Sequence, residues 1–161
     1  MSEVGSELVE VRIVGMALDA YRSSSAHHDE LFREFALVLA RPPEVGHEVP
    51  ARLLALIERL NDRFSSFTAS PEAELQAAIE RGDHSIDLTY RVPMTAREAV
   101  IELADLLAAA DEYCRHGDLL TIAPPPEAVR FRDWYLDEFV AQIDGKPPVP
   151  WSEFEAARSR R

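Results

Sequence analysis

The sequence contains almost no cysteine. Cys114 is the single one among 161 residues, so no disulfide can form within the chain, and cysteine-based zinc and iron–sulfur sites are excluded. No stretch approaches the roughly 18 consecutive apolar residues of a membrane span, and residues 1–5 lack the basic region of a secretory signal. We therefore expect a cytoplasmic protein.

Glycine is also scarce, with six residues in the whole chain. Glycine-rich loops that bring backbone N–H groups close to a phosphate are absent, as are the Gly-x-Ser-x-Gly nucleophile elbow and the zinc-binding helix motif of metalloproteases. The local sequence identifies no catalytic residue, and we expect no cofactor.

Positive charge is in the minority, because 29 acidic residues face 17 basic ones and the net charge is −12. Such a surface repels phosphate backbones and anionic lipids, whose binding depends on clustered Lys and Arg. We expect neither nucleic acid nor a membrane as a partner. An acidic surface can, however, steer a basic protein towards the chain.

The composition, with 47% hydrophobic residues, is typical of a globular domain. Apolar and polar residues alternate in three segments, which predicts strands over 8–14, 86–92 and, more weakly, 119–123. Apolar residues recur three or four apart in five others, which predicts helices over about 18–40, 50–64, 70–81, 95–116 and 126–144. We predict an α+β fold in which a small three-stranded sheet packs with about five helices, in the order β-α-α-α-β-α-β-α. Residues 1–145 form one domain in this prediction, and residues 146–161 form an extended proline-containing tail.

Local signals support several of these boundaries. Ser70 and Pro71 are typical of a helix start, as N-cap and first-turn proline. Thr95 and Glu98 have the spacing of a capping box, and Gly145 follows the last helix as a C-terminal glycine does.

One candidate metal site lies in the first predicted helix. Helical spacing places His27, Glu30 and Glu34 on one exposed face and turns His28 towards the apolar stripe. Di-metal carboxylate bundles use Glu-x-x-His on two helices, whereas the only such sequence here, from Glu44 to His47, lies among prolines. A solvated acidic face and a packed His28 are the structural alternative.

Two further clusters have both a chemical and a structural interpretation. Cys114 and His116 lie at a helix C-terminus, where the dipole disfavours a thiolate, so a structural role is the better interpretation. A site assembled from distant residues such as His28 and His116 stays open. Arg130, Trp134 and neighbouring side chains could stack on a ligand, but acidic residues one turn away can pair with the arginines.

The last predicted helix is apolar around most of its circumference, which implies burial on two sides. The second contact could be another part of the chain or a partner. If it is a partner, which could be a second copy in a homodimer, the candidate contact residues are aromatic: Phe131, Trp134, Tyr135, Phe139 and Trp151.

Four segments carry a family resemblance: HHDELFREFALVLA (27–40), DLTYRVP (87–93), ADEYCRHGDLL (110–120) and PPEAVRFRDWYLDEFVAQIDG (125–145). They resemble an uncharacterised family of small actinobacterial proteins. Its members are similar to accessory components found beside anti-sigma-factor kinases, STAS-domain antagonists and SpoIIE-type phosphatases. The resemblance implies a stress-signalling context and no catalytic residues.

Two functions follow from these observations. The first is a non-catalytic interaction or regulatory module of bacterial signalling that binds another protein. The alternative is a small metal-dependent hydrolase or metal-binding protein that uses His27, His28 and Glu30.

Overall fold

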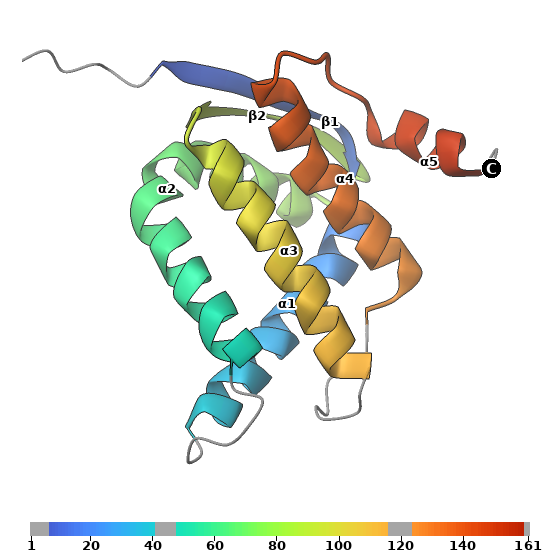
Figure 1. The fold of residues 1–161 in the computed structure, drawn as a ribbon. Helices are drawn as coiled ribbons and strands as arrows, with labels where there is room; N and C mark the ends of the chain where they lie inside the picture. Colours follow the sequence, from blue (N-terminus) through green and yellow to red (C-terminus); the bar gives the residue numbers. More distant parts are fainter. Residues whose placement is uncertain (1–6, 41–47, 116–123, 160–161) are drawn as a thin grey trace, which may run out of the picture.

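The computed structural model of the chain describes residues 7–40, 48–115 and 124–159. A two-stranded antiparallel sheet lies across one end of a group of helices (Figure 1). The elements are β1 (Leu8–Ala17), α1 (Leu18–Leu39), α2 (Glu48–Arg81), β2 (Ser85–Pro93), α3 (Ala96–Arg115), α4 (Pro126–Ile143) and α5 (Trp151–Ser159).

The prediction of a three-stranded sheet is wrong, because the described residues contain a sheet of two strands. The order of elements differs as well, since β1 is followed by two helices and β2 by three. The weak strand predicted over 119–123 lies outside the described residues. The two longer alternating segments form the sheet.

The sheet follows the predicted alternation. Val11 and Ile13 on β1 and Leu88 on β2 are buried on one face, opposite a face of exposed residues. A bulge interrupts the register between Ile13 and Met16, where β1 carries one more residue than β2. Gly15 adopts φ +65° there, and its N–H donates to Asp87 Oδ1 at 2.7 Å, so the bulge is held by a side chain of the other strand.

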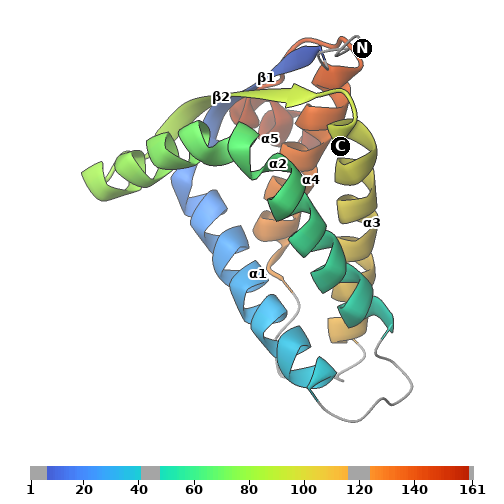
Figure 2. The ribbon, with the colours of Figure 1, turned by 90° about the vertical axis from the view of Figure 1, so that its left-hand side faces the viewer.

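Helix α2 replaces two predicted helices. It runs without interruption for 34 residues and contains Pro71, which we expected to start a new helix. Proline lacks an N–H and its ring clashes with the carbonyl four residues earlier, so it bends a helix that continues through it. Figure 2 shows α2 changing direction before its last, lighter green part. Pro71 is buried, so packing on the core holds the bent helix together.

The helices α1 to α4 form a ring of neighbours, in which α1 packs on α2, α2 on α3, α3 on α4 and α4 on α1. One apolar cluster lies beneath the sheet and a second lies deeper between the helices. The second cluster is centred on these buried side chains: Leu31, Phe35, Leu53, Leu56, Leu106, Leu107, Ala110 and Leu136.

The segment after Gly145 contains a helix where we expected an extended tail. Its prolines suggested extended backbone, but the Pro150 carbonyl accepts the first helical hydrogen bond, from Phe154 N–H at 3.1 Å. Before α5, Val149 is held by two side chains of α4. Its N–H donates to Glu138 at 2.6 Å, and its carbonyl accepts from Trp134 Nε1 at 2.8 Å. The start of this segment is therefore fastened to the body of the protein.

Gly145 ends α4 as predicted. It adopts φ +90°, its N–H donates to the Gln142 carbonyl at 3.0 Å, and the Lys146 N–H donates to the Ala141 carbonyl at 2.9 Å. These two bonds satisfy carbonyl groups that the helix end would otherwise leave without partners. None of the described helices is long and apolar enough to cross a membrane.

Candidate functional site

The main candidate site is a space between the four packed helices, just beneath β2. It consists of two hollows of about 360 Å³ and about 330 Å³. Both are lined by the same central side chains, so they adjoin one another. The shared residues come from α2, β2, α3 and α4: Ile57, Glu72, Tyr90, Leu103, Tyr135 and Leu136.

Two phenol groups meet in the middle of this space. The Tyr135 hydroxyl donates to the Tyr90 hydroxyl at 2.9 Å. Burial raises the pKa of Tyr90 and raises the pKa of Tyr135 further, so both side chains are neutral at physiological pH. One of the two hydroxyl protons is used in the mutual bond, which leaves the other for an acceptor on a ligand.

His28 lines the second hollow and is half-buried. Its ring stacks on Phe32, with 5.9 Å between centroids. Burial, followed by the positive charges of Arg132 and His27, lowers the pKa of His28 to about 4. The imidazole is therefore neutral near pH 7 and can either donate or accept a hydrogen bond.

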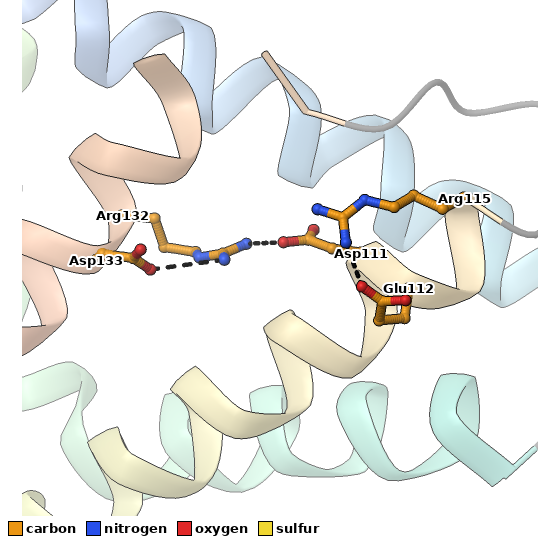
Figure 3. Close-up of polar contacts among 5 residues, drawn as sticks. All are labelled: Asp111, Glu112, Arg115, Arg132 and Asp133. Atoms are coloured by element: carbon orange, nitrogen blue, oxygen red, sulfur yellow. Dashed lines mark hydrogen bonds and ion pairs between the residues drawn. The ribbon is translucent and has the colours of Figure 1, made fainter. Parts of the chain in front are cut away.

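Arg132 lines the same hollow and forms a buried ion pair (Figure 3). Its Nη1 lies 2.8 Å from Asp111 Oδ2, and the two side chains are 8% and 7% exposed. A second, longer contact of 3.6 Å joins Arg132 to the half-exposed Asp133. The pair links α4 to α3, and the neighbouring contact of Arg115 with Glu112 in Figure 3 lies on the surface.

His27 is buried beside this ion pair, whereas we expected it on an exposed face. Burial lowers its pKa, the charge of Asp111 opposes that effect, and its Nε2 has no hydrogen-bond partner. The buried face of α1 is rotated from the predicted one and carries these residues: Leu18, Ala20, Ser24, His27, Leu31 and Phe35. Glu30, one turn further along α1, is exposed, so burial separates it from His27.

The predicted metal set of His27, Glu30 and Glu34 does not come together. Within residues 7–40, 48–115 and 124–159, no group of three or more His, Cys, Asp or Glu side chains is placed to hold a metal ion. Glu44, His47 and His116 and the side chain of Cys114 lie outside the described part of the chain.

The aromatic residues predicted as partner contacts are packed inside the chain. Trp134 is 1% exposed, and Trp151 of α5 closes over it with 5.3 Å between ring centroids. Phe131 and Phe139 are also buried, and Tyr135 lines the central space. The second contact of α4 is therefore with the sheet and α5. A partner reaches Trp134 only if α5 moves away.

The ligand-stacking patch considered around Arg130 and Trp134 does not form either. Arg130 pairs with Glu155 of α5 at 3.1 Å, and Trp134 is covered. The ion pair of Asp111 with Arg132 was not predicted from the sequence. A signal was present, since Asp111 follows Leu107 by four residues and so continues the apolar stripe of α3.

Comparison of the chain with family models, with curated proteins and with solved structures gave no match.

Proposed function

We propose that this chain is a non-catalytic regulatory module that binds a small apolar molecule in the space between α1, α2, α3 and α4. The observation that carries the proposal is the adjoining pair of hollows with the hydroxyl groups of Tyr90 and Tyr135 between them. Ligand sites are typically concave and mostly apolar, with a few placed polar groups that orient the ligand.

The chemistry of the lining indicates the kind of molecule. Most of the wall is aliphatic or aromatic, and the phenol pair offers one hydroxyl proton. Arg132 is already paired with Asp111, so a ligand carboxylate would have to compete with a buried ion pair. An uncharged apolar molecule with one hydrogen-bond acceptor fits this lining best.

Three polar groups of the lining also favour binding without chemistry. The two tyrosines have raised pKa values, and the pKa of His28 is lowered to about 4. A general acid or base works best with a pKa near the operating pH. These groups are therefore suited to hydrogen bonding and not to proton transfer near pH 7.

The regulatory part of the proposal rests on the arrangement of the helices. A ligand between four helices contacts all of them at once, so its binding can change how they pack and how the surface meets a protein partner. The place in bacterial stress signalling is supported by the resemblance of the four segments described above.

A neutral fluorescent probe, N-phenyl-1-naphthylamine, tests the site. Its emission rises when it enters an apolar cavity, and we expect saturable binding with one probe per chain. Leu103→Trp places a larger side chain in both hollows, and we expect at least about a tenfold loss of affinity, because overpacking leaves no room for the probe.

Ile101→Trp is the matched control, since Ile101 lies on the same helix and is 37% exposed. This variant should bind the probe as the unmodified chain does. Far-UV circular dichroism verifies that both variants are folded. Equal binding by folded Leu103→Trp and Ile101→Trp proteins would place the probe elsewhere and refute the proposal.

The metal-dependent hydrolase is the alternative, and a different measurement addresses it. Elemental analysis of protein purified without an affinity tag would show a stoichiometric metal if that function held. His27→Ala should then remove the metal, whereas the ligand-binding proposal expects no metal and no such change.

A further inference from the structure

The two outer edges of the sheet differ in whether a side chain bonds their backbone groups. The edge of β1 is covered by Gln142 of α4, whose side-chain oxygen accepts the Arg12 N–H at 2.8 Å and whose nitrogen donates to the Arg12 carbonyl at 2.8 Å. The amide thus replaces a neighbouring strand at this position. Both backbone groups of Arg12 must therefore point away from β2.

This geometry fixes the direction of the backbone groups on β2. Arg12 lies opposite Thr89 in the antiparallel register. In such a pair the backbone groups of the two residues point either towards each other or both outwards. The N–H and C=O of Thr89 therefore point to the outer edge of β2, and those of Asp87 and Arg91 follow because the strand repeats every two residues.

Among the described residues, none covers this second edge as Gln142 covers the first. In the described ranges, no hydrogen bond outside the ladder with β1 involves the backbone N–H or C=O of Asp87, Thr89 or Arg91. A hollow of about 440 Å³ lies against these residues, between β2 and the bend of α2 at Pro71. The edge therefore has both free backbone groups and space beside it.

The exposed side chains of this edge are complementary to themselves. Asp87, Thr89 and Arg91 all face solvent on the outer face of the sheet. If two β2 strands pair antiparallel about Thr89, each Thr89 faces Thr89 of the second copy. Each Asp87 then faces Arg91 of the second copy, so both charged pairs are of opposite sign.

We propose that β2 pairs with β2 of a second copy of this chain, antiparallel and centred on Thr89, to form a continuous four-stranded sheet. Charges on an edge strand usually discourage such pairing, whereas opposite charges that face one another across two strands stabilise it. Here the row of charges across the joined sheet alternates in sign, because Glu10 lies opposite Arg91 in the register of β1 with β2. The proposal concerns other residues than the buried aromatic rings of α4, and it does not depend on the ligand site.

The net charge of −12 on each copy opposes this association at a distance. At about 0.15 M salt the Debye length is about 8 Å, so the general repulsion is screened while backbone hydrogen bonds persist. We therefore expect self-association in the micromolar range, stronger at about 0.15 M salt than at about 0.01 M.

Sedimentation velocity of the intact chain at rising concentration tests the proposal. Thr89→Pro removes an N–H that points outwards and is not part of the ladder with β1, so it should abolish the dimer and leave the fold intact. Thr89→Val keeps the N–H and should keep the dimer. Circular dichroism and the urea midpoint confirm that both variants are folded.

A pair of charge reversals tests the register itself. Arg91→Glu places like charges at both charged positions and should weaken self-association by roughly tenfold or more. Asp87→Lys should do the same. An equimolar mixture of the two variants should form a heterodimer, because both charged pairs between the two copies are again of opposite sign.

The proposal is overturned if the unmodified chain stays monomeric up to several hundred micromolar. It is also overturned if folded Thr89→Pro remains as dimeric as Thr89→Val. Failure of the mixture to associate would refute the register centred on Thr89.

Discussion

The buried pair of Arg132 and Asp111 gives the most demanding test of how the helices are held together. Replacing Arg132 with Met leaves the carboxylate of Asp111 without its partner, in a position where that side chain is 7% exposed. A surface pair would be worth at most about 1 kcal/mol, but removing one partner of a buried pair costs about 3–5 kcal/mol. We expect the larger loss here, since the 3.6 Å contact of Asp133 accompanies Arg132 and offers nothing to Asp111.

The double variant Arg132→Met with Asp111→Leu separates the two contributions to this cost. It removes both charges and fills the space with apolar atoms, so no buried charge remains without a partner. Such replacements range from about neutral to a gain of about 1–4 kcal/mol. The double variant should therefore be much more stable than Arg132→Met alone.

Urea unfolding followed by circular dichroism and tryptophan fluorescence measures these free energies. The dependence of the free energy on urea must stay the same among the variants, since a change would mean a different unfolded or native state. Arg97→Met is the control. Arg97 bonds Asp144 at 2.8 Å, but the two side chains are 41% and 40% exposed, so its loss should cost much less than the loss of Arg132.

Two results would contradict this reasoning. A loss for Arg132→Met no larger than that for Arg97→Met would mean that Asp111 finds water or another partner. A double variant as unstable as the sum of its single variants would mean that the cost comes from packing and not from the unpaired charge.

Two further predictions concern other parts of the chain. The pKa of His28 is about 4 in the folded chain and about 6.5 when unfolded, so the unfolded chain takes up the proton first and stability falls as the pH drops from 6.5 to 4. The loss is up to about 3 kcal/mol, and His28→Gln should remove that part of the slope in unfolding measurements between pH 4 and 7. Trp151→Ala should lower the free energy of unfolding by about 3–5 kcal/mol in the same assay, because the Trp151 side chain is 8% exposed and packs on Phe131 and Trp134. Ser152→Ala, on the exposed side of α5, is the control and should change this free energy by less than about 0.5 kcal/mol.

Where a local pattern was long, the sequence predicted the fold well. Both strands of the sheet and the helices α1, α3 and α4 lie where alternation, periodicity and Gly145 placed them. Local signals failed at prolines. Pro71 resembles a helix start, yet it is buried in the middle of α2, and the prolines before Trp151 resemble an extended tail, yet α5 follows them. In both cases burial of nearby apolar groups outweighed the local preference.

The candidate site could not be predicted from local sequence patterns. Tyr90 and Tyr135 lie 45 positions apart, one on β2 and the other on α4, and nothing in either segment indicates that their hydroxyl groups meet. The burial of His27 was not predicted, because α1 offers two stripes with the same helical spacing. The predicted buried stripe runs through Tyr21 and His28, and the observed one runs through Ser24, His27 and Leu31. Only the packing of α1 on the other helices decides between them.

The bond between Arg12 and Gln142 joins positions 130 residues apart, and this separation bears on how the chain reaches its native state. Contacts between distant segments form slowly, because a long loop must close before they contribute. During synthesis β1 is complete long before α4 emerges, so its outer edge is exposed throughout that interval. An uncovered strand edge is a template for aggregation. Replacement of Gln142 would therefore lower the yield of folded protein in the cell by more than the lost stability alone accounts for.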